Sequence, residues 1–140
     1  MKKIAIMGAR GFVGKALTAH LQDKYTVYPI TREQFSLLDE QAVTEFFEKE
    51  NIDVVFHCAN QGGSRKTGYD VAAPDVIGNN LKMFFNMERC LKDGMKLINF
   101  GSGAQYNKAR DLVKVKEDTI GTVIPKDDYG YSKYVMSEYL

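Results

Sequence analysis

Short apolar runs alternate with longer stretches of helical periodicity along this chain of 140 residues. Four runs are apolar, β-branched or aromatic, as buried strands are, and they lie at residues 3–7, 25–30, 53–58 and 95–100. A further short strand is expected at residues 36–38. Apolar residues at helical spacing predict helices between and after the strands, at residues 12–24, at residues 39–50, from about residue 73 or 75 to residue 91, and from about residue 129 to the end of the chain.

This alternation of strands and helices is typical of βαβ units and of a parallel sheet covered on both faces. We therefore expect an α/β fold with a doubly wound, Rossmann-type sheet, in which the five strands have the order 3-2-1-4-5. No internal repeat, low-complexity segment or change of composition divides the chain. Residues 1–140 are accordingly expected to form one domain.

Composition excludes several classes of protein. Apolar residues make up 44% of the chain and charged residues 26%, which rules out a disordered chain. Lys and Arg number 19 and Asp and Glu 18, so the net charge of +1 does not indicate a nucleic-acid-binding protein. No apolar stretch approaches the roughly 18 residues that a membrane-spanning helix needs, so no membrane partner is expected.

Two cysteines, Cys58 and Cys90, form neither a Cys-x-x-Cys motif nor a cluster with histidine. We expect no metal site for this reason. Both cysteines lie in apolar or helical patterns and are expected to be small buried residues with free thiols. Free thiols suit the reducing cytoplasm, where we expect the protein to be located.

Three glycines form a Gly-x-x-Gly-x-x-Gly motif between the first strand and the first helix, at Gly8, Gly11 and Gly14. In a dinucleotide-binding turn the first glycine permits the tight turn, the second lets the backbone approach the pyrophosphate, and the third lets the helix pack against the sheet. Free N–H groups at the helix N-terminus, near Phe12 and Val13, would then face the phosphates. The alternative is a glycine-rich turn that binds no ligand.

Two arginines favour NADP over NAD. An NAD-binding fold usually has an acidic residue at the end of the second strand, where it binds the ribose hydroxyls, but Arg32 stands at that end here. A guanidinium pairs well with a phosphate, and Arg10 in the glycine turn can reach the same 2′-phosphate. NAD is the second choice, because both arginines can equally be solvated and Glu33 can turn inward to bind the ribose.

Three further residues are candidates for cofactor binding. Asp39 can accept a hydrogen bond from the adenine amino group or can cap the helix that follows it, and the two roles can coexist. Ala59 and Asn60 follow the strand at residues 53–58. They are candidates because ligands of parallel sheets bind beyond the carboxyl ends of the strands.

Tyr129 and Lys133 form a Tyr-x-x-x-Lys pair in the last predicted helix. Residues four apart share one face of a helix, and a lysine ammonium there favours the ionised phenol, which makes Tyr129 a candidate acid/base. Lys133 can also hold the nicotinamide ribose. Ser102 follows the strand at residues 95–100 and can bond the same reacting oxygen as Tyr129, or it can be only a turn residue.

These motifs together resemble the extended short-chain dehydrogenase/reductases, which include NAD(P)-dependent sugar-nucleotide epimerases, dehydratases and reductases. The resemblance rests on Gly8 to Gly14, on the sequence His-Cys-Ala-Asn at residues 57–60, on Gly-Ser-Gly at residues 101–103 and on Tyr-Gly-Tyr-Ser-Lys at residues 129–133. It implies a catalytic triad of Ser102, Tyr129 and Lys133, in which the tyrosine transfers the proton and nicotinamide exchanges hydride with a sugar carbon.

The resemblance also shapes what we expect of the whole protein. The chain stops inside the helix that carries Lys133, so we expect an incomplete cofactor domain whose C-terminal substrate domain is absent. The nucleotide-sugar substrate would belong to the full-length protein, and the resemblance implies a homodimer. The alternatives are a non-catalytic dinucleotide-binding module or redox-sensing regulator of the same fold, and an inert cofactor-domain fragment.

Overall fold

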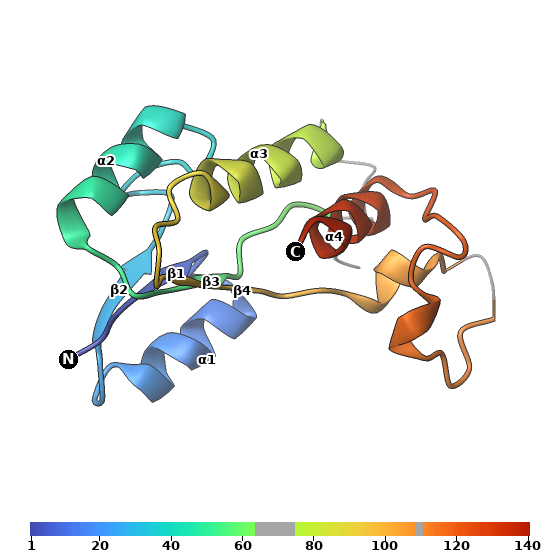
Figure 1. Ribbon diagram of the computed structural model, residues 1–140, viewed down its shortest axis with the longest axis horizontal. Helices are drawn as coiled ribbons and strands as arrows, with labels where there is room; N and C mark the ends of the chain where they lie inside the picture. The colour runs from blue at the N-terminus through green and yellow to red at the C-terminus, as the bar shows by residue number, and fades with distance from the viewer. Residues whose placement is uncertain (64–74, 109–110) are drawn as a thin grey trace. The chain divides into compact units, whose positions relative to one another are not determined.

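The computed structural model describes residues 1–63, 75–108 and 111–140 (Figure 1). These residues form two compact units. Unit 1 consists of Met1–Asn60 and Lys82–Phe100, and unit 2 consists of Gln61–Leu81 and Gly101–Leu140.

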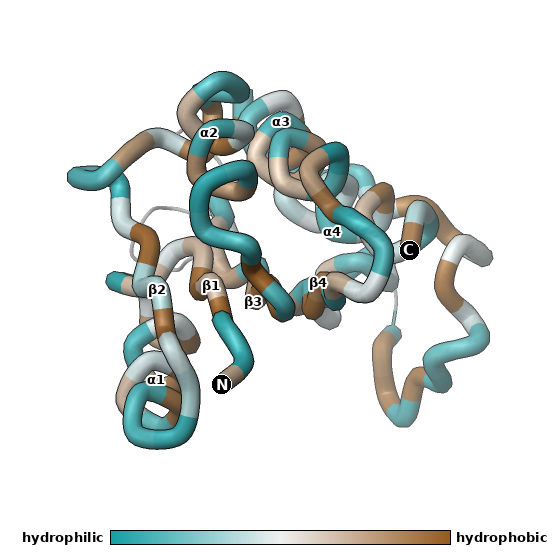
Figure 2. The backbone as a smooth tube through the Cα atoms, turned by 60° about the vertical axis from the view of Figure 1, so that its left-hand side comes forward, coloured by the Kyte–Doolittle hydropathy of each residue, from teal (hydrophilic) through white to brown (hydrophobic). Residues whose placement is uncertain are grey.

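Unit 1 is built on a parallel sheet of four strands, in the order β2-β1-β3-β4. The strands are β1 (Lys3–Met7), β2 (Thr26–Ile30), β3 (Val54–His57) and β4 (Lys96–Asn99). Figure 2 shows the hydrophobic residues of the central strands β1 and β3. The parallel, Rossmann-like α/β architecture is as expected, and the four strands have the relative order predicted for them.

The strand expected at residues 36–38 does not form, and this prediction was wrong. Local hydrogen bonds occupy the backbone there: the N–H of Leu38 donates to Ser36 Oγ at 3.2 Å, and the N–H of Asp39 donates to the Ser36 carbonyl at 3.0 Å. The carbonyl of Leu37 accepts a hydrogen bond from the side chain of Asn86 at 2.9 Å. The Leu37 side chain is buried in the core. The apolar residue therefore packs into the core from a turn and not from a strand.

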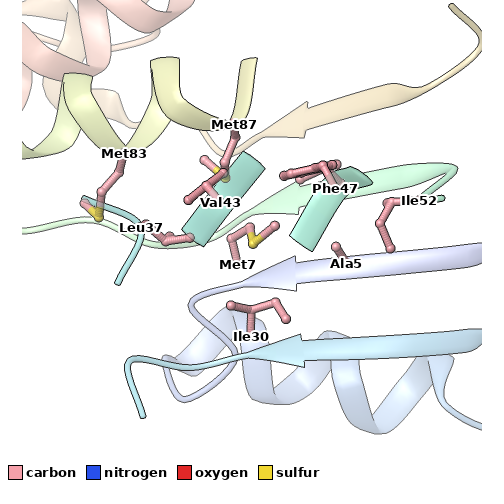
Figure 3. Packing of buried hydrophobic residues seen from close by; sticks show 10 residues of the cluster. Ala5, Met7, Ile30, Leu37, Val43, Phe47, Ile52, Met83 and Met87 are labelled. Atoms are coloured by element: carbon pink, nitrogen blue, oxygen red, sulfur yellow. The ribbon is translucent and has the colours of Figure 1, made fainter. Parts of the chain in front are cut away.

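Helices cover both faces of this sheet (Figure 1). Helix α1 (Phe12–Leu21) packs on one face through Leu17 and Leu21, against a cluster that includes Ile4 and Ile6. On the other face, α2 (Glu40–Glu50) and α3 (Val76–Glu88) contribute to the larger cluster shown in Figure 3. Successive residues of β1 thus point to opposite faces, which is why the strand is apolar throughout.

Helices α1 and α3 end slightly earlier than their patterns indicate, whereas α2 ends at Glu50 as predicted. Helix α1 stops at Leu21, because the N–H groups of Lys24 and Tyr25 both donate to the Leu21 carbonyl at 3.0 Å in a turn. The first predicted start of α3, near residue 73, lies outside the described residues. Gly94, which follows the end of this helix, has a φ of 85° and belongs to the turn before β4.

Unit 2 contains the first part of α3, two short 3-10 helices and the last helix. The 3-10 helices η2 (Gly103–Tyr106) and η3 (Glu117–Thr119) lie between β4 and the last helix. Helix α4 (Asp128–Tyr139) packs against η2. A β-carbon on Gly130 would lie 2.7 Å from the Ala104 carbonyl oxygen, so α4 approaches η2 at the level of the backbone.

Cys58 and Cys90 form no disulfide with each other and are only half-buried, which corrects the expectation that both are buried. The reason is their position at the margins of the two apolar clusters, where each packs against the core from one side. No helix in the described part of the chain is long and apolar enough to cross a membrane.

Candidate functional site

The turn between β1 and α1 is packed too tightly for a side chain at Gly8 or Gly14. Gly8 has a φ of 85°, and a β-carbon there would lie 2.8 Å from both the Cα and the N of Ala59. A β-carbon on Gly14 would meet the Gly8 carbonyl oxygen and would lie 2.8 Å from Ala9 Cα. Ala59 therefore lies at the turn, directly beside Gly8, as its position after β3 predicted.

Hydrogen bonds fix this turn to the end of β2. The N–H groups of Gly8 and Ala9 donate to the Ile30 carbonyl at 3.2 and 3.0 Å, and the N–H of Gly11 donates to the Gly8 carbonyl at 3.0 Å. Gly11 is the N-cap of α1 and offers no side chain to cap it, and the first turn of α1 has no acidic residue. The N-terminus of α1 is thus electrostatically suited to an anion.

The residues around this N-terminus are exposed. The side chain of Phe12 is 93% exposed and that of Val13 is 36% exposed. Arg10 is also exposed and forms an ion pair with Glu33, in the turn that follows β2. Arg32 lies in the same turn with an exposed side chain. The structure therefore brings both predicted arginines to one region of unit 1, and it gives Glu33 a partner there.

Asp39 caps α2, because its Oδ1 accepts a hydrogen bond from the Ala42 N–H at 3.1 Å. Of the two roles considered for Asp39, the structure of unit 1 shows helix capping. Asn60 is exposed just after β3. His57, the last residue of β3, is 1% exposed and its ring centroid lies 6.0 Å from that of Phe84.

Tyr129 and Lys133 lie together on α4 in unit 2. The Nζ of Lys133 is 5.9 Å from the centroid of the Tyr129 ring, and the Lys133 side chain is buried although it carries an ammonium group. The helix begins just before this pair because Asp127 caps it, accepting a hydrogen bond from the Gly130 N–H at 2.8 Å. Asp127 also pairs with Lys108 at 3.6 Å.

Ser102 is the N-cap of η2, where its Oγ accepts a hydrogen bond from the Ala104 N–H at 3.2 Å. Gln105 completes a capping box, since its Oε1 accepts from the Ser102 N–H at 3.3 Å. The same Oε1 accepts a hydrogen bond from Ser137 of α4 at 3.0 Å. Ser102 is therefore a turn residue, as one reading of the sequence held, and its turn is attached to the helix of Tyr129 and Lys133.

Two polar residues and one glycine that the sequence motifs do not mark as functional connect to Tyr129 in unit 2. The backbone of Gly63 lies against the Tyr129 ring, Ser132 donates a hydrogen bond to the Tyr129 carbonyl, and Asn80 donates one to Ser132. Asn80 and Ser132 are both fully buried. Burial of uncharged polar residues leaves no periodic signal in a sequence, so only their position in the fold reveals them.

The described residues contain no group of three His, Cys, Asp or Glu side chains arranged to hold a metal ion.

The candidate residues fall into two groups, one in each unit. The glycine turn with Arg10 and Arg32 belongs to unit 1, and Ser102, Tyr129 and Lys133 belong to unit 2.

This chain is similar to known proteins over most of its length. GDP-L-fucose synthase of Escherichia coli (strain K12) is 31% identical over 132 residues, which are 91% of this chain and 41% of that protein. In particular, Arg10 to Gly14, Thr31 to Glu33 and the glycine pair Gly62 and Gly63 resemble GDP-fucose synthases. This chain thus spans about two fifths of the length of that relative.

Two solved structures from Campylobacter jejuni have the same fold. A GDP-D-glycero-L-gluco-heptose synthase, determined in the presence of NADPH, is 27% identical with a TM-score of 0.79. A GDP-mannoheptose C4 reductase with NADP bound is 27% identical with a TM-score of 0.78. Each comparison covers 97% of this chain and 41% of the other. The sequence pattern of the NAD-dependent epimerase/dehydratase family matches residues 4–140, and the chain therefore belongs to this family.

Proposed function

We propose that this chain binds NADP(H) and carries the proton-transfer group of an enzyme that acts on nucleotide sugars as an epimerase, dehydratase or reductase. The observation that carries the proposal is the β1–α1 turn, in which Gly8 and Gly14 leave no space for a β-carbon beside an uncapped helix N-terminus. Related structures that contain NADP or NADPH support the choice of cofactor.

The residues of unit 1 fit such a cofactor. The backbone N–H groups at the start of α1 would bind the pyrophosphate, and Arg10 and Arg32 would bind the 2′-phosphate by charge-assisted hydrogen bonds. Arg10 must then exchange its ion pair with Glu33 for the phosphate. When bound, the cofactor would supply hydride exchange with a sugar carbon.

In unit 2, Tyr129 would transfer a proton to or from a sugar hydroxyl or carbonyl. The neighbouring Lys133 would orient the tyrosine and hold the nicotinamide ribose, and Ser102 would bond the reacting oxygen. A lysine that is buried next to a tyrosine has a clear use in this chemistry, whereas a redox sensor of the same fold needs no such pair. Ala104 stands where the fucose synthases, by resemblance, carry a cysteine used in epimerisation, so this chain has no proton-transfer group at that position.

Titration of the chain with NADPH and NADH, followed by nicotinamide fluorescence, tests the proposal. We expect tighter binding of NADPH. Arg32→Ala should weaken NADPH binding by about tenfold to a hundredfold, because a hydrogen bond to a charged group contributes about 1.5–3 kcal/mol, and it should leave NADH binding nearly unchanged. Arg89→Ala is the control. Arg89 is, like Arg32, an exposed arginine of unit 1, and it pairs with Glu40. Failure of the chain to bind either nucleotide would contradict the proposal.

Glu33→Gln separates two possible roles of the glutamate. If Glu33 only competes with the 2′-phosphate for Arg10, the substitution should strengthen NADPH binding and leave NADH binding unchanged. Weaker NADH binding would instead identify Glu33 as a ligand of the ribose hydroxyls. NADP would then no longer be expected over NAD as the cofactor.

A further inference from the structure

Asn80 of α3 is buried, and its side chain forms three hydrogen bonds with described residues of unit 2. Its Oδ1 accepts from the Gln61 N–H at 2.7 Å, and its Nδ2 donates to the Gln61 carbonyl at 3.0 Å. The side chain thus bonds both polar groups of one backbone residue, as a neighbouring strand would. Nδ2 also donates to Ser132 Oγ at 3.1 Å, and Asn80 is 1% exposed.

The bond to Ser132 connects Asn80 to the backbone of Tyr129. Ser132 is fully buried, and its hydroxyl accepts from Asn80 and donates to the Tyr129 carbonyl at 2.8 Å. One buried hydroxyl therefore links the first part of α3 to the first turn of α4.

The bonds to Gln61 connect Asn80 to the other side of Tyr129, its ring. Gly63, two residues after Gln61, has a φ of 71°, and a β-carbon there would lie 2.6 Å from Cε1 and Cζ of Tyr129. The Gly63 backbone therefore lies directly on the phenol ring, at the carbon that bears the hydroxyl. A side chain at Gly63 would displace the ring.

We propose that Asn80 is a positioning residue for Tyr129, which it holds from two sides. One connection runs through Ser132 to the Tyr129 backbone, and the other runs through Gln61 and Gly63 to the ring. The catalytic meaning of this arrangement rests on the proposed function, but the positioning itself does not.

The chemistry of the connection requires an amide. Asn80 acts as an acceptor once and as a donor twice, and its amide satisfies these roles in only one orientation. An aspartate of the same shape would keep at most the bond from the Gln61 N–H, and its charge would be buried. Removal of the side chain leaves the Gln61 backbone and Ser132 without these partners, which is costly for buried polar groups.

Nuclear magnetic resonance of the whole chain tests the proposal through the α-protons of Gly63. These protons lie against the Tyr129 ring, so its ring current should shift their signals upfield, and Tyr129→Leu should abolish that shift. Asn80→Ala should remove most of the upfield shift, because both connections are lost. Ser132→Ala should remove a smaller part, because the connection through Gln61 remains.

The matched control is Asn86→Ala. Asn86 lies on the same helix, is also 1% exposed and also donates to a backbone carbonyl, that of Leu37. This variant should lower stability and leave the Gly63 signals in place. An unchanged Gly63 shift in a folded Asn80→Ala chain would overturn the proposal.

Two further arms keep the test decisive. If Asn80→Ala does not fold, as judged by the β1 amide signals, the Ser132→Ala and Asn80→Asp chains take its place, and unchanged Gly63 signals in both overturn the proposal. The result is independent of the nucleotide titrations, so a chain that binds no NADPH can still show that Asn80 positions Tyr129.

Discussion

At the scale of single residues, the glycines of the first turn differ in how much space surrounds them. Gly14 faces the backbone of Gly8 and Ala9, whereas a β-carbon on Gly11 would lie 3.3 Å from the Gly8 carbonyl oxygen. Gly103 has no atom within 4 Å of such a β-carbon. The crowding around an added β-carbon therefore decreases from Gly14 through Gly11 to Gly103.

We expect Gly14→Ala to lower the free energy of unfolding by about 1–3 kcal/mol, because the added methyl group must displace backbone atoms in a packed turn. Gly11→Ala should cost less, and Gly103→Ala should be nearly neutral. Urea denaturation of the three variants checks this order. A Gly14→Ala chain as stable as the Gly103→Ala chain would show that the turn is looser than the structure indicates.

At the scale of elements, the start of each helix follows from a local cap that can be read along the chain. Asp39 begins α2 and Asp127 begins α4, each through one carboxylate oxygen and a backbone N–H three residues ahead. Helix α1 is the exception, since Gly11 offers no cap. An uncapped helix start is unfavourable by itself, and in unit 1 it coincides with the turn that we expect to bind phosphate.

Asp39→Ala should lower the free energy of unfolding by about 1 kcal/mol, the usual loss when an N-cap is removed. Asp39→Asn should restore most of it, because an amide oxygen also accepts the bond from Ala42. Urea denaturation measures both effects. If the Asn variant keeps its stability but binds NADPH less tightly, the carboxylate also contacts the cofactor, whereas an Asp39→Ala chain of unchanged stability would contradict the capping role.

At the scale of the whole molecule, the proposed binding of NADP(H) would be coupled to folding. A ligand that binds only the folded chain stabilises it by RT ln(1 + [L]/Kd). The proposed NADP(H) site includes residues of unit 1 that are far apart in the sequence, such as Gly8 and Arg32, and an unfolded chain does not bring them together. NADPH should therefore stabilise the chain according to its affinity.

At an NADPH concentration of about 100 times Kd, the free energy of unfolding should rise by about 2.7 kcal/mol. At that same concentration, Arg32→Ala should gain only about 1.4 kcal/mol if its affinity is about tenfold weaker. Denaturation with and without NADPH measures both values, and Arg89→Ala should behave as the unchanged chain does. Equal stabilisation of all three chains would show that Arg32 does not contact the nucleotide.

Much of the fold was predictable because its signals are local. The four main strands and the glycine turn follow from runs of a few residues, and the placement of Tyr129 and Lys133 on one helix follows from their spacing. The strand expected at residues 36–38 shows where such signals fail. Leu37 is as apolar as a strand residue, but its carbonyl bonds a side chain 49 residues away, and no local pattern contains that partner.

The division between local and long-range determinants is clearest around Tyr129 and Arg10. Neighbouring residues are enough to place Tyr129 in a helix and Arg10 in a glycine-rich turn before a helix, because capping, glycine conformation and helical spacing act over a few residues. Only folding pairs Arg10 with Glu33, 23 residues away, and joins Asn80 to Gln61 and, across 52 residues, to Ser132. A buried hydrogen bond depends on which backbone groups the packed core leaves without partners, and that is decided when distant segments meet.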